Sequence, residues 1–362
     1  MKSNSVYIHI PYCKKICSYC DFCKVYYNET WAINYLDKLE IEIKNVYQDE
    51  IIKTIYIGGG TPSALSFDAL KKLFDIIKIF KLDKECEFTF ECNLSDINEK
   101  LLEVLVSGGV NRLSIGVQSF NKNNLLYLNR KASFLDAKEK INLCKKMGIG
   151  NVNVDLIYAL KGQSLFDLDK DLDLFLKLDI THISTYSLIL EKNTILSYQN
   201  ESYVDEDIDA MMYKHICDKL KENGFIHYEV SNFAKDGFFS KHNLTYWNNE
   251  TYYGFGLGAS GYLENVRYTN TRSLSKYLKE EFLDYKELIT EEDRFSYELM
   301  LGFRKLEGIN VENINKKFKI NLLDMDNIQK ELNNNNLVYE NGNIFINPDK
   351  LYIMNEILVN LL

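Results

Sequence analysis

Three features that the chain lacks exclude whole classes of protein. No apolar run approaches the ~20 residues that a membrane-spanning helix needs, so we expect no transmembrane segment. The first residues contain no apolar stretch of the kind found in signal peptides, which favours a cytoplasmic location. The formal net charge is -9, and this excess of acidic residues argues against a nucleic-acid partner.

The sequence does have enough apolar residues for a large core, and it shows a repeating pattern of strand and helix segments. The chain has 362 residues, of which 46% are hydrophobic, enough for a barrel and a smaller second domain. Short β-rich runs alternate with amphipathic helical segments, and the predicted strands are 6–10, 54–57, 86–90, 112–117, 151–158 and 182–189. Six strand–helix units are too few for a complete eight-stranded barrel. The sequence therefore predicts an α/β fold based on a partial (β/α)6 barrel with parallel strands.

The alternation stops near residue 200, and this change predicts three domains. We expect residues 1–200 to form the partial barrel, 201–290 an α+β extension and 291–362 a C-terminal domain. In the last domain, helical segments precede two apolar runs joined by Asn341-Gly342, which is a strong signal for a β-hairpin. Helices followed by a hairpin indicate a winged-helix-like domain.

Four of the eight cysteines lie between residues 13 and 23. Grouped thiols in a reduced protein indicate metal or redox chemistry rather than disulfides. Cys13, Cys17 and Cys20 read C-x3-C-x2-C, a spacing that can hold a [4Fe–4S] cluster with one open iron. Cys17, Cys20 and Cys23 read C-x2-C-x2-C, which suits a closed electron-transfer cluster. A structural zinc is a further alternative.

Glycine or polar residues follow each of the first five predicted strands. The cysteine loop follows the first strand and a glycine triplet at 58–60 follows the second. The third, fourth and fifth strands are followed by Glu91, Gln118 and Asp155. In parallel α/β folds the chemistry lies at the carboxyl ends of the strands. This coincidence favours a reactive, open site over a structural zinc site.

A set of motifs resembles the radical S-adenosylmethionine (SAM) superfamily and, within it, the anaerobic coproporphyrinogen III oxidase family. The motifs are YIHIPYC at 7–13, YCDF at 19–22, GGGTPS at 58–63, RLSIGVQSF at 112–120 and VDLIY at 154–158. The resemblance covers nearly the whole chain. It implies a [4Fe–4S] cluster whose open iron is chelated by SAM. One electron from the cluster then cleaves SAM to methionine and a 5′-deoxyadenosyl radical.

The resemblance also implies roles for individual residues. Cys13, Cys17 and Cys20 would be the cluster ligands. The residues that would contact SAM are Tyr7, Tyr19, Gly59, Gly60, Thr61 and Glu91, together with Gln118, Arg130 and Asp155, which match positions that line the same cavity. The chemistry agrees, because carboxylates suit ribose hydroxyls and a guanidinium suits the carboxylate of methionine.

Two further features resemble the HemW-type haem chaperone branch of this family. The chain reaches Cys13 without the long N-terminal segment of true coproporphyrinogen dehydrogenases, and residues 242–247 match the His-Asn-x-x-Tyr-Trp motif linked to haem binding in that branch. The resemblance therefore implies a radical SAM haem chaperone that binds a [4Fe–4S] cluster, SAM and haem, with His242 as a haem ligand. The alternative for His242 is a hydrogen-bonded core residue.

The same resemblance implies partners and an alternative function. A haem chaperone would bind haem or a related porphyrin and deliver haem to an acceptor such as a respiratory protein. An electron donor such as flavodoxin or ferredoxin would reduce the cluster. The alternative is an oxygen-independent coproporphyrinogen III oxidase, which decarboxylates coproporphyrinogen III to protoporphyrinogen IX in porphyrin biosynthesis.

Overall fold

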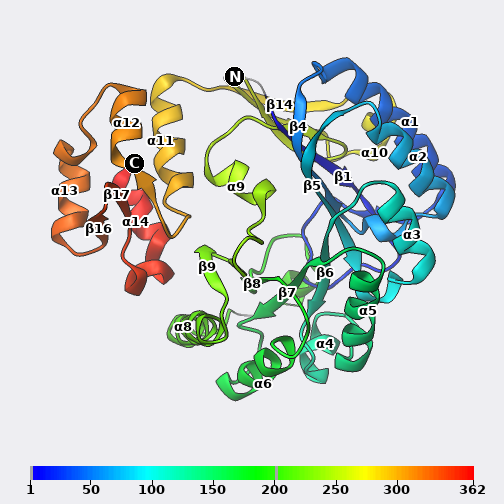
Figure 1. Cartoon of the computed structure of the whole chain (residues 1–362), viewed down its shortest axis with the longest axis horizontal. Coiled ribbons are helices and arrows are strands. Elements are labelled where there is room, and N and C mark those ends of the chain that lie inside the picture. The colour runs from blue at the N-terminus through cyan, green and yellow to red at the C-terminus, as the bar shows by residue number, and fades with distance from the viewer. Residues whose placement is uncertain (1–2, 200–202) are drawn as a thin grey trace.

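The centre of the computed structural model is a curved nine-stranded sheet, and the structure describes residues 3–199 and 203–362 (Figure 1). Six strands pair in parallel in the order β1, β4, β5, β6, β7 and β8. Their bounds are Ser5–Ile10, Ile51–Gly59, Lys81–Asn93, Arg112–Gln118, Asn151–Tyr158 and His182–Ser187. The prediction of a partial barrel of six parallel strands is confirmed. Strands β4 and β5 extend several residues beyond their predicted ranges.

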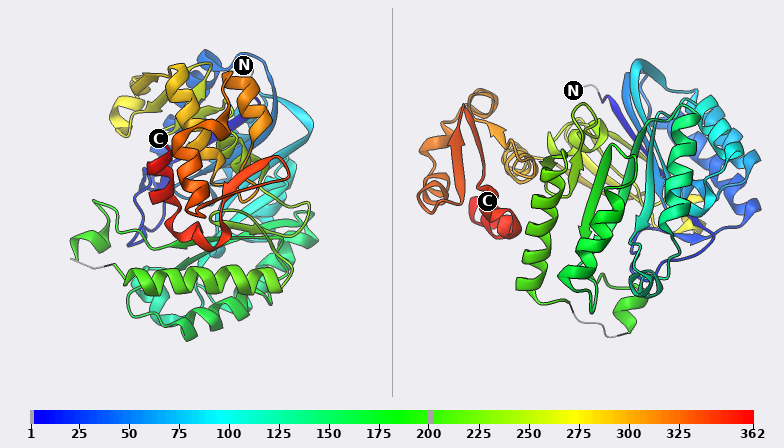
Figure 2. Two further views of the ribbon diagram at one scale, coloured as in Figure 1. Left: turned by 90° about the vertical axis from the view of Figure 1, so that its left-hand side faces the viewer. Right: turned by 60° about the horizontal axis from the view of Figure 1, so that its bottom comes forward.

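Helices cover the outer face of this sheet (Figure 2). They include α1 (Glu29–Val46), α2 (Phe67–Ile77), α3 (Glu99–Ser107), α5 (Phe134–Lys146) and α6 (Leu165–Phe175). Ile55, Phe88 and Leu113 of the sheet are at most 1% exposed and belong to the hydrophobic core. Successive residues of a strand point to opposite faces, so polar neighbours such as Thr89 and Ser114 point to the inner face. The sheet therefore has an apolar outer face and a polar inner face.

The chain beyond residue 203 completes both edges of the sheet. Strand β11 (Tyr253–Phe255) pairs in parallel with β1, while β10 (Asn232–Ala234) pairs antiparallel with β8 and with β9 (Ile226–Glu229). A smaller antiparallel sheet contains β12 (Ser260–Leu263), β13 (Val266–Asn270) and β14 (Leu283–Leu288). The helices here are α8 (Glu206–Glu222), α9 (Lys241–Trp247) and α10 (Leu274–Tyr277). The predicted boundary between residues 200 and 201 lies outside the described residues, and the main sheet takes strands from both sides of it.

The last part of the chain lies to one side of the main sheet and combines helices with a three-stranded sheet (Figures 1 and 2). The elements are α11 (Glu291–Gly302), β15 (Ile309–Asn310), α12 (Val311–Phe318), α13 (Asp326–Asn333), β16 (Leu337–Glu340), β17 (Asn343–Ile346) and α14 (Met354–Leu361). The predicted hairpin is confirmed between β16 and β17. Asn341 and Gly342 both have positive φ angles, 51° and 82°, as a two-residue type I′ turn requires. Helices thus precede a hairpin here, as expected, and the winged-helix-like character of this domain stays a prediction.

Short elements connect these parts. They are β2 (Tyr12–Cys13), β3 (Val25–Tyr26), α4 (Lys122–Tyr127), α7 (Ile195–Tyr198) and four 3-10 turns, η1 (Pro62–Ala64), η2 (Leu94–Asp96), η3 (Leu322–Asp324) and η4 (Pro348–Ile353). Among the helices that the structure describes, none has the length and apolar character needed to cross a bilayer.

Candidate functional site

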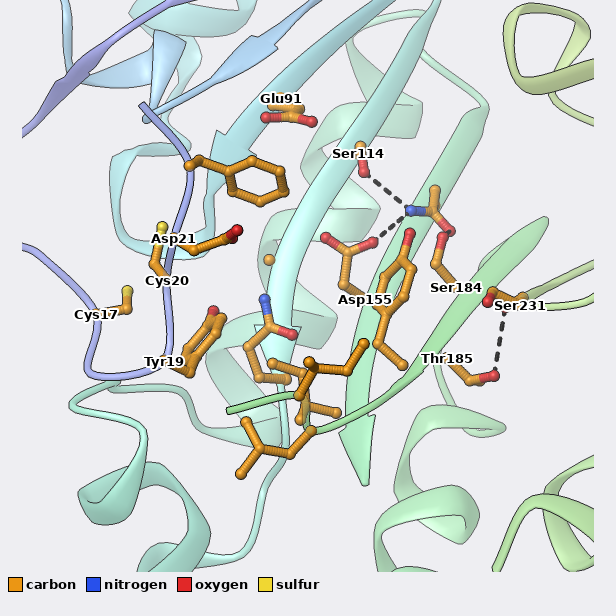
Figure 3. Close-up of a pocket in the computed structure, with 18 of the residues that line it drawn as sticks. Cys17, Tyr19, Cys20, Asp21, Glu91, Ser114, Asp155, Ser184, Thr185 and Ser231 are labelled. Atoms are coloured by element: carbon orange, nitrogen blue, oxygen red, sulfur yellow. Dashed lines mark hydrogen bonds between the residues drawn. The ribbon is translucent and has the colours of Figure 1, made fainter. Parts of the chain in front are cut away.

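A cavity of about 550 Å³ lies on the polar inner face of the sheet and opens toward the carboxyl ends of the strands. Eleven of the residues singled out from the sequence line it: Cys13, Cys17, Tyr19, Cys20, Gly59, Gly60, Thr61, Glu91, Gln118, Arg130 and Asp155. In Figure 3 the loop that carries Cys17, Tyr19 and Cys20 faces Asp155 across this space. The fold thus brings together residues that are up to 142 positions apart, from Cys13 to Asp155.

The cysteine loop is closed by the parallel pairing of β2 with β3. The Cys13 thiol is buried and lies 3.5 Å from the hydroxyl of Thr61, which follows the glycine triplet. Burial raises the pKa of Cys13 to about 11, and the neighbouring thiols of Cys20 and Cys17 add to the rise. The three thiols of the C-x3-C-x2-C spacing are therefore neighbours at one end of the cavity.

Cys23 faces away from this group. Its thiol lies 3.8 Å from the carbonyl oxygen of Arg272, and a Cβ on Gly258 would come within 2.9 Å of the Cys23 Cβ. It is absent from the cavity wall that Cys13, Cys17 and Cys20 share. Within the described chain, no group of three His, Cys, Asp or Glu side chains is arranged to hold a single metal ion.

The glycine triplet lies at a point where the chain has no space for side chains. Gly59 has a φ of 114°, and a Cβ there would lie 2.6 Å from the His9 ring. A Cβ on Gly60 would lie 2.7 Å from the carbonyl carbon of Pro11. The loop therefore packs directly on the chain that leads to Cys13, and only glycine allows that approach. The backbone N–H of Gly59 is also used, because it donates to Glu91 Oε2 at 3.0 Å.

Two carboxyl groups face the cavity from β5 and β7, which lie on either side of β6. Glu91 accepts a hydrogen bond from the Tyr56 hydroxyl at 2.7 Å, and burial, helped by the charge of Asp155, raises its pKa to about 7. Asp155 accepts from Asn153 Nδ2 at 2.8 Å, and burial raises its pKa to about 6 although Arg130 and other polar neighbours oppose the rise. Both groups offer carboxylate oxygens to a hydroxyl of a ligand in the cavity.

The end of β6 and the following loop supply an amide and a guanidinium. Gln118 is 5% exposed, has a positive φ of 74°, and its Oε1 has no hydrogen-bond partner among the described residues. Arg130 donates to Asn93 through Nη1, while its Nε has no partner there. A Cβ on Gly116 would come within 2.3 Å of Arg130 Nη2, so this glycine makes room for the guanidinium. Arg130 is thus held in the cavity rather than in a solvated loop.

Tyr7 and His242 are not part of the cavity wall. The Tyr7 hydroxyl lies 2.9 Å from His9 Nδ1. His242 is 1% exposed, with Nδ1 2.8 Å from the Thr54 hydroxyl and Nε2 2.8 Å from the Tyr246 hydroxyl. Both ring nitrogens of His242 are therefore hydrogen bonded within the chain, an arrangement that agrees with the alternative of a hydrogen-bonded core histidine. Haem ligation by His242 stays a prediction.

The sequence did not point to a second group of residues that line the cavity, which we call the tyrosine wall. It consists of Tyr158, Tyr186, Leu188, Ile189, Tyr213 and Tyr352. Tyr186 and Ile189 are 45% and 60% exposed, and Tyr352 is 40% exposed. These residues come from β7, β8 and the loop after it, α8 and the η4 turn, so no local motif joins them. The end of the VDLIY motif, Tyr158, was the one available signal.

Comparison with known proteins identifies the family of this chain. Residues 7–175 match the family described as the Radical SAM superfamily. The heme chaperone HemW of Lactococcus lactis is 41% identical over 93% of this chain and 91% of its own length. The chain belongs to the HemW family. HemW of Bacillus subtilis is 38% identical over 87% of this chain and 86% of its own length. Membership of the radical SAM superfamily implies a [4Fe–4S] cluster and SAM as cofactors.

A solved structure shares the same fold at low sequence identity. Coproporphyrinogen III oxidase (HemN) from Escherichia coli superposes with a TM-score of 0.87, covering 98% of this chain and 89% of its own. The sequence identity is 19%, so this likeness concerns the fold alone. It supports the partial barrel predicted from the sequence. The function is inferred from the HemW relatives and from the site.

Proposed function

We propose that this protein is a radical SAM haem chaperone, which binds a [4Fe–4S] cluster, SAM and haem and delivers haem to acceptor proteins. The observation that carries the proposal is the 41% identity to the heme chaperone HemW of Lactococcus lactis over nearly the full length of both chains. The fold by itself gives no such answer, since one fold supports many activities. An acceptor such as a respiratory protein, and an electron donor such as flavodoxin or ferredoxin, remain predictions.

The proposed cluster ligands are Cys13, Cys17 and Cys20. The support is that their thiols are neighbours at one end of the cavity, whereas Cys23 turns toward Arg272. Three ligands leave one iron open for a small molecule, as a reactive site needs. A thiol must lose its proton to bind iron, so cluster assembly releases protons. When bound, the cluster supplies the electron that reduces SAM.

The proposed SAM site is a group of lining residues that we call the motif wall: Tyr19, Gly59, Gly60, Thr61, Glu91, Gln118, Arg130 and Asp155. The glycine loop lets a ligand lie against the backbone, and Glu91 and Asp155 offer acceptors for hydroxyls. The unpartnered Nε of Arg130 suits a carboxylate. Tyr7 contributes from behind this wall, through its hydrogen bond to His9.

The proposed haem site is the tyrosine wall. Haem is a large flat ring that is apolar on its faces and carries two propionates. Tyr186, Ile189 and Tyr352 present exposed aromatic and aliphatic surface to the cavity, and such groups suit a ring of this kind. Lys15 of the cysteine loop also lines the cavity and offers positive charge to a propionate.

A haem titration tests this function. Apo protein, with and without the reconstituted cluster, is titrated anaerobically with haem, and the Soret band is followed. We expect saturation at one haem per chain, and transfer of the bound haem to a haem-free acceptor protein in a second mixture. Absence of a saturating Soret band in both samples would contradict the proposal.

A further inference from the structure

The motif at 242–247 forms helix α9, which lies against the inner face of the sheet. It contacts β4 on one side and α11 on the other (Figure 1). Its first turn is fixed by β5, because the backbone N–H groups of Lys241 and His242 donate to the two carboxylate oxygens of Glu87, both at 3.0 Å. The Ser240 side chain accepts from the N–H of Asn243. The helix is therefore anchored to the interior of the barrel from two strands.

Asn243 of α9 lines the cavity directly, and the neighbouring His242 contacts a lining residue from behind. Its ring packs against the ring of Tyr56, with centroids 5.2 Å apart and planes 31° apart. Thr54, which is hydrogen bonded to Nδ1, and Tyr56 are alternate residues of β4 and so point to the same face. The imidazole thus contacts the strand at two consecutive inward positions.

Tyr56 transmits this contact to the motif wall. Its hydroxyl donates to Glu91 Oε1 at 2.7 Å, and the other carboxylate oxygen of Glu91 accepts from Gly59 N–H at 3.0 Å. Tyr56 and Glu91 both line the cavity, whereas His242 lies behind them. A continuous series of contacts therefore runs from His242 through Tyr56 and Glu91 to the glycine loop.

We infer that His242 is a positioning residue that holds Tyr56, and through it Glu91, in the orientation that the SAM site requires. In this arrangement it is not an axial ligand of haem. The reasons are the two occupied ring nitrogens, the burial of the ring and its packing on the one tyrosine that fixes Glu91. The inference rests on the proposed SAM site and is independent of where haem binds.

The test compares variants in anaerobically reconstituted full-length protein. His242→Ala removes the ring, while His242→Phe keeps a ring against Tyr56 and has no nitrogen for iron. Two readouts are measured: the SAM dissociation constant, by equilibrium dialysis and by the SAM-dependent change in the electron paramagnetic resonance spectrum of the reduced cluster, and the haem Soret titration. Iron content and circular dichroism establish that each variant is folded.

We expect His242→Ala to weaken SAM binding about tenfold, as expected for one disturbed buried hydrogen bond, and to leave haem binding unchanged. His242→Phe should restore most of the SAM affinity and also leave haem binding unchanged. The matched control Tyr246→Phe breaks one hydrogen bond of His242 without touching Tyr56, and should keep SAM affinity.

If His242→Ala does not fold, Tyr56→Phe tests the same link, because it removes only the hydroxyl that fixes Glu91. It should weaken SAM binding by a similar factor, and adding His242→Phe should cause no further loss. Loss of the Soret band in both His242 variants with unchanged SAM binding would overturn the inference. Wild-type protein that shows no SAM-dependent spectral change would instead refute the proposed SAM site, a failure that is visible before any variant is compared.

Discussion

The two walls of the cavity differ in how they are built. On the motif wall, Glu91 is held by Tyr56 and Gly59, and glycines at 59 and 60 leave no room for a side chain. On the tyrosine wall, Tyr186 and Tyr352 are about half exposed and come from elements 166 positions apart in the sequence. A wall whose side chains are fixed by hydrogen bonds suits a small ligand that binds in one orientation. An exposed aromatic wall suits a ligand that is bound and later released. This difference is the reason that we propose the motif wall for SAM and the tyrosine wall for haem.

The largest effect should follow from breaking the cluster end of the motif wall. Cys13→Ala should abolish cluster assembly, since two thiolates cannot hold it, and SAM binding should be lost with it. Haem binding at the tyrosine wall should persist. Iron analysis and the visible absorption of the cluster, with a parallel Soret titration, measure both effects.

The matched control is Cys23→Ala, which should keep its iron because this thiol faces Arg272. Equal loss of iron in the Cys23 and Cys13 variants would mean a closed four-thiolate site.

The next largest effect should come from the glycine loop. Gly60→Ala places a Cβ 2.7 Å from the carbonyl carbon of Pro11, and backbone strain of this kind costs roughly 1–3 kcal/mol. We expect SAM binding to weaken roughly tenfold to a hundredfold, with haem affinity unchanged. Gly150→Ala, where a Cβ meets nothing within 4 Å, is the control and should change neither affinity. Equal loss of haem affinity in Gly60→Ala would remove the distinction between the walls.

A smaller and opposite effect is expected at the tyrosine wall. Tyr352→Ala removes an aromatic ring that faces the cavity from the η4 turn, and haem affinity should fall about fivefold while SAM affinity is kept. Tyr352→Phe keeps the ring and should bind haem nearly as well as the wild type. Isothermal titration with both ligands gives the two constants. Weaker SAM binding in Tyr352→Ala would show that SAM also uses this wall.

A last effect, on stability rather than on ligand affinity, concerns pH and the buried carboxyl of Glu91. Burial raises its pKa from 4.5 to about 7, so between these values the folded state binds more protons than the unfolded state. The free energy of unfolding of the apo protein should therefore fall as the pH rises from 4.5 to 7, by about 2 kcal/mol from this group. Glu91→Gln should flatten that slope in urea titrations. An unchanged slope would mean that Glu91 titrates normally.

The sequence predicted part of the motif wall from strand ends, because the glycine triplet, Glu91, Gln118 and Asp155 follow strands whose own pattern is clear. Tyr19, Thr61 and Arg130 were instead implied by the family resemblance. Glu91 and Asp155 end long β-rich runs, and the glycine triplet marks the end of another. The edge strands were not predicted, since β10 and β11 have three residues each and pair only because the sheet is already formed. The hairpin was predicted because Asn341-Gly342 fixes its turn locally.

The environment of side chains could not be predicted in the same way. The motif at 242–247 was found, but the partner of His242 Nδ1 is Thr54, which lies 188 positions earlier. The tyrosine wall depends on β8, α8 and the η4 turn meeting in space, and Tyr186, Tyr213 and Tyr352 carry no shared spacing. Functional residues at the ends of strands can therefore be predicted from the sequence. A group of residues that tertiary packing brings together from distant elements cannot.

We propose that the chain carries haem on a radical SAM frame. The most direct test of this proposal is one anaerobic sample of reconstituted protein given SAM, dithionite and coproporphyrinogen III, with a haem titration of the same preparation. We predict a saturating Soret band and no decarboxylation of coproporphyrinogen III. Formation of protoporphyrinogen IX with release of carbon dioxide would contradict the account and make the protein a coproporphyrinogen III oxidase.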